Sequence, residues 1–299
     1  LKIYTAFDPI VQRHAEQSVS QTVDSLDKTI ESAVVVSDVK SGDVVALVGG
    51  RRMRYAGFNR AIDAVRPMGS LIKPAVYLAA LEQPKNYTLA TSLSDGVVEV
   101  KGANGSVWKP RNFDRKSHGK VLLHNALAQS YNQASTRLGM QLGLDKVLDM
   151  VKRLGVKRRL PEVPALLLGA GSLSPIEVAQ MYQTIASHGI SRPLRTIIEI
   201  RDQQSKPLVR YPVQSNPVVE KRVVHLLHYS MMEVVREGTG KSVYQRLSDD
   251  FAVAGKTGTT NDLRDSWFAG FAGDYLAVVW MGRDDNQSAQ LTGASGALK

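Results

Sequence analysis

The stretch that follows Ser70 constrains the fold more than any other part of the chain. From Leu71 to Leu81 almost no polar residue interrupts the apolar ones, which is typical of a helix buried on all its faces. Pro74 is tolerated in such a helix only in the first turn, so we expect the helix to begin near Ser70. With 299 residues, 43% of them hydrophobic, the chain is long enough to form one large globular domain, or two small ones, around it.

The remaining patterns place strands at both ends of the chain and helices between them. Strands are expected at 33–39 and 44–48, around a turn at Ser41-Gly42-Asp43, and at 251–256, 266–271 and 275–281. A helix should start at Asp8-Pro9 and run to about Thr29, and others are expected at 121–129, 133–142, 145–154, 175–187 and 219–237. Strands and helices do not alternate regularly, which favours an α+β fold with one mainly antiparallel sheet.

Composition excludes several classes of protein. The chain has no cysteine, which removes disulfides, thiolate nucleophiles and Cys-ligated zinc. His225 and His228 share a helical face, but no His-Glu-x-x-His motif accompanies them, and we interpret them as residues of a polar face rather than metal ligands. We expect chemistry without metal or cofactor. The formal charge of +10 raises nucleic-acid binding as an alternative, but the basic residues are scattered and favour a solvated exterior.

A serine with a lysine three residues later occurs five times, and such pairs arise by chance in a chain of this size. Only Ser70 and Lys73 lie at the start of an apolar helix, where residues three apart share a face. A lysine on such a helix is costly unless it is paired, and burial lowers its pKa, which makes it a candidate general base. Seen alone, Lys73 could equally be a surface lysine that extends from a core helix. The other pairs are Ser25/Lys28, Ser37/Lys40, Ser106/Lys109 and Ser117/Lys120.

Two further motifs favour the catalytic interpretation. Ser130-Tyr131-Asn132 is the only Ser-x-Asn triplet and lies between two predicted helices, where its default role would be helix capping. Lys256-Thr257-Gly258-Thr259 ends a predicted strand, and the flanking glycines would let a ligand approach the strand closely. Ser-x-x-Lys, a Ser-x-Asn-type triplet and Lys-Thr-Gly, in this order, form the set used by penicillin-binding proteins and class A β-lactamases.

Longer segments around these motifs resemble class A, or bifunctional, penicillin-binding proteins of the 1b type, over nearly the whole chain. The segments that carry the resemblance are Arg66 to Pro74, Trp108 to Phe113, Gly238-Thr239-Gly240, Ala254 to Asp262, Arg264 to Gly270 and Leu291 to Leu298. The resemblance implies a β-lactamase/transpeptidase-like fold, with a mainly antiparallel five-stranded sheet flanked by helices and a helical subdomain. Residues 1–32 would be a linker segment and first helix, and residues 33–299 the transpeptidase domain.

The resemblance also implies a role for each motif residue. Ser70 would attack the carbonyl between the two terminal D-alanines of a peptidoglycan stem peptide, and Lys73, held by Asn132, would take its proton. Ser130 would relay a proton to the leaving amine under the influence of Lys256. The backbone N–H groups of Ser70 and Thr259 would form the oxyanion hole. In the Lys256-Thr257-Gly258-Thr259 segment, the two threonine hydroxyls would bind the terminal carboxylate.

Class A relatives imply further parts and partners. An N-terminal membrane helix and a glycosyltransferase domain would belong to a longer parent protein at the periplasmic face of the bacterial inner membrane. Partners would be stem peptides that end in D-Ala-D-Ala, β-lactam antibiotics and other cell-wall synthesis proteins, with no nucleic acid. A membrane would be contacted only through the missing N-terminal part.

Three alternatives remain within the same fold. A D,D-carboxypeptidase would use water as the acceptor. A β-lactamase would need a base that positions water, and Glu162 lacks the expected Glu-x-x-x-Asn context. A sensor domain would be acylated once and signal, but the flanking segments resemble synthases.

Overall fold

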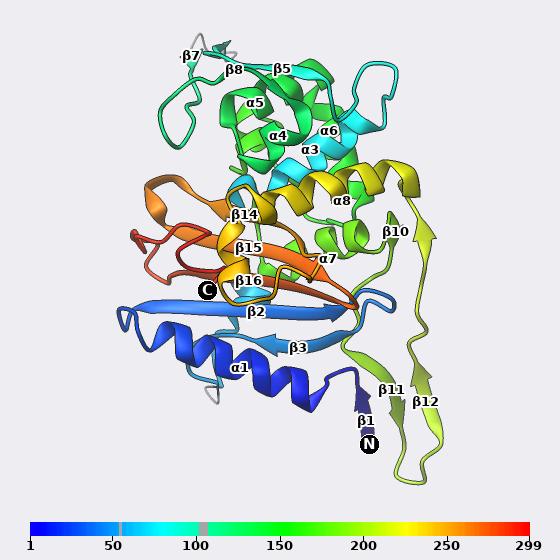
Figure 1. The fold of residues 1–299 in the computed structure, drawn as a ribbon. Coiled ribbons are helices and arrows are strands. Elements are labelled where there is room, and N and C mark those ends of the chain that lie inside the picture. Colours follow the sequence, from blue (N-terminus) through cyan, green and yellow to red (C-terminus); the bar gives the residue numbers. More distant parts are fainter. Residues whose placement is uncertain (54–55, 102–106) are drawn as a thin grey trace.

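The computed structural model describes residues 1–53, 56–101 and 107–299, and its centre is a five-stranded antiparallel sheet (Figure 1). The strand order is β14-β15-β16-β2-β3, so strands from both ends of the chain lie side by side. Strand β14 is an edge strand, and one side of its backbone therefore faces away from the sheet. The α+β fold with one mainly antiparallel sheet is confirmed. The strands are β2 (Ile30–Asp38), β3 (Val44–Val48), β14 (Ala254–Thr259), β15 (Asp265–Ala272) and β16 (Tyr275–Arg283).

Helices cover both faces of this sheet. Helix α1 packs on one face, against β2 and β3, while α7 and α8 lie on the other (Figure 1). Helices α3 to α6 form a helical part beside β14, with α3 at its centre, while the short helix α2 packs against α7, β2 and β3. The helices are α1 (Pro9–Val23), α2 (Arg60–Asp63), α3 (Lys73–Leu81), α4 (Leu123–Ala128), α5 (Asn132–Leu142), α6 (Leu144–Arg153), α7 (Pro175–Ala186) and α8 (Lys221–Arg236).

Short strands complete the fold as small antiparallel sheets. A three-stranded sheet, β1-β11-β12, extends away from the domain (Figure 1). The other pairs are β4 with β9, β5 with β8, β6 with β7 and β10 with β13. Their bounds are β1 (Lys2–Thr5), β4 (Arg66–Pro67), β5 (Ser92–Asp95), β6 (Val100–Lys101), β7 (Val107–Trp108), β8 (Gly119–Leu122), β9 (Ser172–Leu173), β10 (Ile190–Ser191), β11 (Ile197–Arg201), β12 (Pro207–Arg210) and β13 (Asn216–Pro217).

The buried helix after Ser70 is confirmed. Residues Gly69–Ile72 form a short 3-10 helix that leads directly into α3, and Pro74 lies in the first turn of α3. Every residue of α3 is buried, and its apolar side chains belong to the main hydrophobic core. Burying one large apolar side chain stabilises a fold by roughly 1.5–3 kcal/mol, so this helix contributes strongly to the core.

Four predictions about local structure are wrong. Strand β2 begins at Ile30, not at residue 33, because it pairs with β16 as far as Arg283, which lies opposite Ile30. Helix α1 ends at Val23, not near Thr29, because the Asp27 carboxylate accepts hydrogen bonds from the backbone and side chain of Thr29 and forms a turn before β2. Strand β14 begins at Ala254, not Phe251, because its pairing with β15 starts with Ala254 opposite Phe271, and β15 continues for only one more residue, to Ala272. His228 is buried and bonds the carbonyl of Ile185, rather than lying on a polar face.

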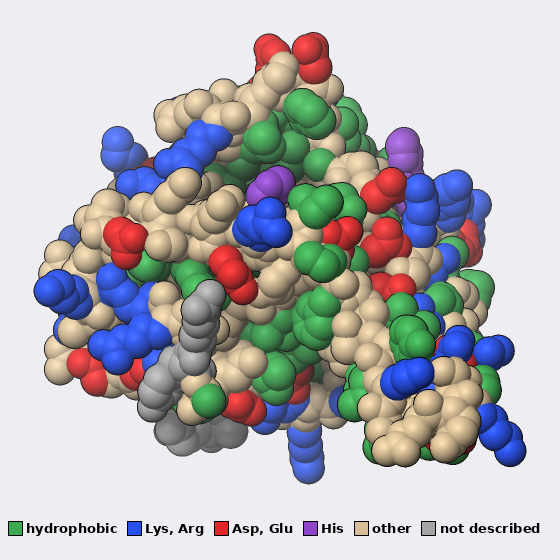
Figure 2. All heavy atoms as spheres, turned by 90° about the horizontal axis from the view of Figure 1, so that it is seen from below, with side chains coloured by type: hydrophobic (Ala, Val, Ile, Leu, Met, Phe, Trp, Pro, Cys, Tyr) green, Lys and Arg blue, Asp and Glu red, His purple; other side chains and the backbone are tan. Residues whose placement is uncertain are grey.

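In the described part of the face seen in Figure 2, the basic side chains form no continuous tract. Lys and Arg side chains lie in several separate groups on that face, with Asp and Glu among them. Among the residues that the structure describes, none of the helices is both long and apolar enough to span a membrane.

Two glycines bring the turn that carries Ser70 against strand β14. Gly69 has φ +54°, and a Cβ there would lie 2.8 Å from the Thr259 carbonyl oxygen. Gly258 faces the same turn, where a Cβ would lie 3.0 Å from both the Met68 carbonyl oxygen and Leu71. The close approach of the two segments therefore depends on the absence of side chains at both positions.

We expect Gly69→Ala to destabilise the domain by roughly 2–4 kcal/mol, because a left-handed backbone and a clash with a strand act together. Gly273→Ala is the matched control, since Gly273 also has a left-handed φ, +56°, but a Cβ there meets nothing within 4 Å. Strain alone should cost about 1–2 kcal/mol in this control. Urea unfolding measures both variants, and equal losses would contradict the importance of the close approach.

Candidate active site

Ser70 lines a cleft between the sheet edge and the helical part. The cleft has a volume of about 480 Å³, and Ser70, Ser130, Asn132, Thr257 and Thr259 all line it. Three segments that are distant in sequence therefore meet at one place: the 3-10 turn before α3, the loop between α4 and α5 together with the first residue of α5, and strand β14.

Lys73 lies beneath the cleft, with an exposed fraction of 0%. Its Nζ donates to the Ser130 carbonyl oxygen at 2.7 Å, to the Ser130 Oγ at 3.2 Å and to the Asn132 Oδ1 at 2.7 Å. Burial lowers the pKa of Lys73 well below its ordinary value, the nearby Lys256 lowers it further, and Asp95 acts in the opposite direction. A lysine amine with a strongly lowered pKa can accept a proton near neutral pH.

Lys256 is the second buried amine, also with no exposed surface. It lies within β14 and donates to the Ser130 Oγ at 2.9 Å and to the Thr257 carbonyl oxygen at 3.1 Å. Burial lowers its pKa to about 7. The Ser130 hydroxyl thus lies between two amines whose pKa values are both lowered by burial.

Ser130 itself has a strained backbone. Its φ is +58°, in the left-handed region that residues other than glycine rarely adopt. The backbone N–H groups of Ser130 and Tyr131 donate to carbonyls of α4, and the Ser130 carbonyl and hydroxyl both accept from Lys73. Strain of this kind is commonly found at functional sites.

Threonine side chains form the wall of the cleft opposite Ser130. Thr257 Oγ1 lies 2.6 Å from Thr239 Oγ1, and Thr259 Oγ1 accepts a hydrogen bond from the Gly293 backbone at 3.0 Å. Gly258 differs from its neighbours: it packs against Met68 and is not among the residues that line the cleft. Its contribution is to let β14 approach the Ser70 turn.

The chain matches the penicillin binding protein transpeptidase domain over residues 32–297. It belongs to this family. Among curated relatives, it is 45% identical over 304 residues to penicillin-binding protein 1B of Vibrio cholerae and 43% identical over 306 residues to that of Escherichia coli. Both matches cover all of this chain, which spans 39% and 36% of those relatives.

Solved structures of penicillin-binding proteins have the same fold. PonA1 from Mycobacterium tuberculosis superposes with a TM-score of 0.87 at 25% identity, over 99% of this chain and 79% of that one. The complex of PonA1 with penicillin V gives a TM-score of 0.86 at 25% identity, over 99% of this chain and 80% of that one. Penicillin-binding protein 1A from Haemophilus influenzae gives 0.81 at 26% identity, over 87% of this chain and 44% of that one.

The other Ser-x-x-Lys pairs lie outside the cleft of this transpeptidase domain, as far as they are described. Ser25 donates to the Thr22 carbonyl after α1, and Ser37 is buried in β2 and donates to Gln183. Ser117 donates to the Gln133 side chain. Ser106 lies outside the described residues.

Sequence reasoning missed several residues of the site. Thr239 and Asn112 line the cleft, yet they entered the sequence comparison only as parts of resembling segments. The His118 ring stacks on Tyr131 and contacts Asp95, and neither His118 nor Asp95 belongs to a motif recognised in the sequence. Asp114 also lines the cleft, and it is the only carboxylate among the described residues that line it.

We expect Lys256→Met to make the domain more stable at pH 7 by about 1–4 kcal/mol, because burying an ammonium is unfavourable. The folded protein binds fewer protons than the unfolded chain between about pH 7, the folded pKa of Lys256, and its ordinary pKa of 10.5, so wild-type stability rises with pH in this window. The stability advantage of Lys256→Met over the wild type should therefore shrink as the pH rises through this window. Urea unfolding at several pH values measures the free energy of unfolding of both proteins.

Lys85→Met, at an exposed position, is the control and should change the free energy of unfolding little at any of these pH values. A Lys256→Met protein less stable than wild type at pH 7 would show that the hydrogen bonds of this amine outweigh the cost of burying it.

Proposed function

We propose that this chain is a serine-type D,D-transpeptidase that cross-links peptidoglycan stem peptides. Ser70 attacks the carbonyl between two terminal D-alanines, an ester forms with Ser70, and D-alanine leaves. An amine of a second stem peptide then attacks the ester and releases Ser70. The observation that carries this proposal is the Ser130 hydroxyl between two fully buried lysine amines, in the same cleft as Ser70.

Lys73 is proposed as the general base for Ser70. Burial lowers its pKa, which favours the neutral amine that can accept a proton, and the two residues are three apart at the start of one buried helix. Asn132 Oδ1 holds the amine in place. This arrangement activates a serine without histidine.

Ser130 is proposed to carry the proton to the leaving amine. Its Oγ accepts hydrogen bonds from both lysines, so its own proton is free to point into the cleft. With a pKa of about 7, Lys256 can return a proton to this relay after D-alanine leaves.

The tetrahedral oxyanion is proposed to lie between the backbone N–H groups of Ser70 and Thr259. The contacts of Gly69 with Thr259 support this, since they bring the turn and the edge strand together. An edge strand also has backbone groups free of the sheet on its outer side. Fixed donors of this kind stabilise a developing oxyanion.

The terminal carboxylate of the donor is proposed to bind the Thr257 and Thr259 hydroxyls, within the Lys256-Thr257-Gly258-Thr259 segment. Thr239 supports Thr257 through their short hydroxyl contact and adds a third hydroxyl to this wall. Lys256 adds positive charge behind it when protonated.

β-Lactams are proposed to acylate Ser70 in place of the stem peptide. The structure of PonA1, a protein with the same fold, was determined in complex with penicillin V. This chain is proposed to consist of a linker segment and first helix, residues 1–32, and the transpeptidase domain, residues 33–299, and to be part of a longer parent protein. That parent would carry a glycosyltransferase domain and a membrane anchor, face the periplasm and bind cell-wall synthesis proteins, but no nucleic acid.

We expect Ser70→Ala to abolish covalent labelling by a simple penicillin, because the attacking oxygen is lost. Ser25→Ala, Ser37→Ala and Ser117→Ala should still be labelled, since these serines lie outside the cleft. Intact-protein mass spectrometry after brief exposure detects the adduct, and peptide mapping locates it. Labelling that persists in Ser70→Ala would overturn the site assignment.

We also expect the penicillin adduct of the wild-type protein to persist for hours. Glu162 is exposed and does not line the cleft, where Leu168 lies instead, so a base for hydrolysis is not provided from that segment. A time course of adduct mass and penicillin concentration measures this. Rapid loss of the adduct with steady consumption of penicillin would identify a β-lactamase.

A cross-linking assay separates the remaining alternatives. Donor and acceptor stem peptides should give a cross-linked product with release of D-alanine. Release of D-alanine without a cross-linked product would indicate a D,D-carboxypeptidase, and an adduct without turnover of any stem peptide would indicate a sensor domain.

A further inference from the structure

Helix α5 begins without a cap from its own sequence. Tyr131 occupies the N-cap position, and its side chain makes no capping hydrogen bond. The first backbone N–H groups of a helix have no partner within it and are costly when buried unpaired. The first residue of α5 is Asn132, whose side chain binds Lys73. Whatever fixes this end of the helix therefore also fixes that contact.

Two residues far away in the sequence supply the missing cap. Asn112 Oδ1 accepts from the backbone N–H of Asn132 at 2.6 Å and from that of Gln133 at 3.2 Å. Asp95 Oδ1 accepts from the backbone N–H of Ala134 at 3.0 Å. A carboxylate is favourable at the positive end of a helix dipole, so the cap is electrostatic as well as directional.

Asp95 also holds the loop that carries Asn112. Its exposed fraction is 0%, and its Oδ2 accepts from Asn112 Nδ2 at 2.6 Å and from the His118 backbone N–H at 3.1 Å. The His118 ring nitrogen Nδ1 lies 2.7 Å from the same oxygen. A buried carboxylate with this many partners fixes the geometry around it, because losing any of them leaves a buried polar group unpaired.

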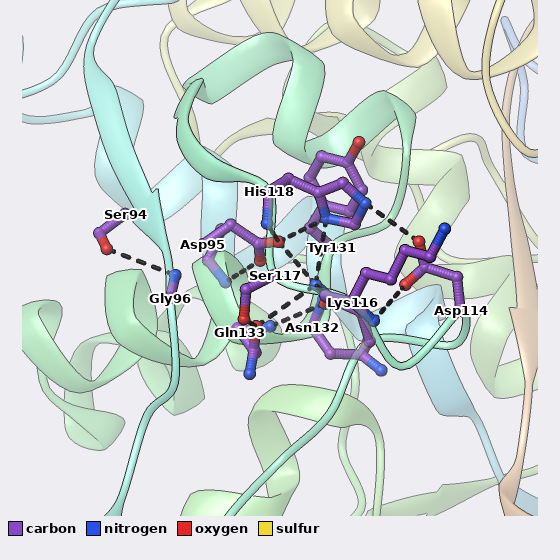
Figure 3. Close-up of polar contacts among 12 residues, drawn as sticks. Ser94, Asp95, Gly96, Asp114, Lys116, Ser117, His118, Tyr131, Asn132 and Gln133 are labelled. Atoms are coloured by element: carbon purple, nitrogen blue, oxygen red, sulfur yellow. Dashed lines mark hydrogen bonds and ion pairs between the residues drawn. The ribbon is translucent and has the colours of Figure 1, made fainter.

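His118 connects this cluster to the wall of the cleft. Its ring stacks on Tyr131, with centroids 4.1 Å apart and planes at 17°. Its Nε2 lies 3.0 Å from Asp114 Oδ2. His118, Tyr131 and Asp114 all line the cleft, and Figure 3 shows the ring between the two carboxylates. The contacts thus run from the cleft wall through Asp95 to the start of α5.

We propose that Asp95, Asn112 and His118 are positioning residues for acylation of Ser70: they fix the start of α5 so that Asn132 holds Lys73. This role rests on the proposed function of Ser70 and Lys73. None of the three residues reacts. Their effect falls on the rate of the chemical step, because a general base displaced by a fraction of an ångström transfers protons much more slowly.

The main test is Asp95→Asn, which keeps the shape but turns two acceptors into one acceptor and one donor. The time course of acylation is measured over a range of penicillin concentrations, which separates the dissociation constant of the non-covalent complex from the limiting acylation rate. We expect the limiting rate to fall about 10–100-fold, as for other residues that orient catalytic groups, with the dissociation constant nearly unchanged.

Glu199→Gln is the matched control. Glu199 is also a buried carboxylate, 8% exposed, but it pairs with Arg201 and Arg210 in the β1-β11-β12 sheet. It should leave the limiting rate unchanged. The limiting rate is measured only on molecules that react, so partial unfolding lowers the amplitude in either variant and not the rate.

His118→Gln is a milder second variant if Asp95→Asn fails to fold. The His118 side chain is 25% exposed, and glutamine can keep one of its two side-chain contacts. We expect a smaller fall in the limiting rate. Amide hydrogen exchange of Asn132, Gln133 and Ala134 should be faster in both variants, and this readout does not depend on penicillin.

Two kinetic results would overturn the proposal: a limiting rate in Asp95→Asn that falls no more than in Glu199→Gln, or a loss confined to the dissociation constant. A wild-type protein that forms no adduct would instead defeat the proposed function. In that case amide exchange still decides whether Asp95 fixes the start of α5, and unchanged exchange in the variants would overturn that role as well.

Discussion

Two lysine amines are buried against one serine hydroxyl, and the rest of the site is arranged around this contact. Burial of Lys73 and Lys256 is unfavourable for their charged forms and lowers both pKa values. The fold tolerates it because each amine has acceptors: the Ser130–Asn132 segment for Lys73, and Ser130 with a backbone carbonyl for Lys256. The same burial that reduces stability gives the amines their proposed function as proton carriers.

Bringing those amines together requires a close junction between the sheet and the helical part. Lys73 lies on the central buried helix, and Lys256 on the edge strand β14. Gly69 and Gly258 remove the side chains that would separate these elements. The Ser70 turn and Lys73 lead directly into α3, whose apolar side chains belong to the main core, so these groups cannot move without disturbing that core.

The third segment of the site, Ser130 to Asn132, is not part of that junction and needs support of its own. Ser130 has a strained backbone, and Tyr131 does not cap the helix that follows. Asp95 and Asn112 replace the missing local cap. Support from distant residues leaves the Ser130 and Asn132 side chains free to bind Lys73, whereas a local serine or asparagine cap would use its side chain on the backbone.

The sequence by itself determined the elements with strong local patterns. The apolar run after Ser70 predicts the buried helix, and the predicted bounds of the long helices that follow lie within two residues of the observed ones. Burial of one helix face requires apolar residues at a regular spacing, and this spacing can be seen in the sequence. The order of the three motifs likewise indicates the family. Only the tertiary structure decided the register of β14, the burial of His228 and the role of Asp95. These depend on which distant segments face one another, and a single buried carboxylate in a short strand leaves no periodic signal in the sequence.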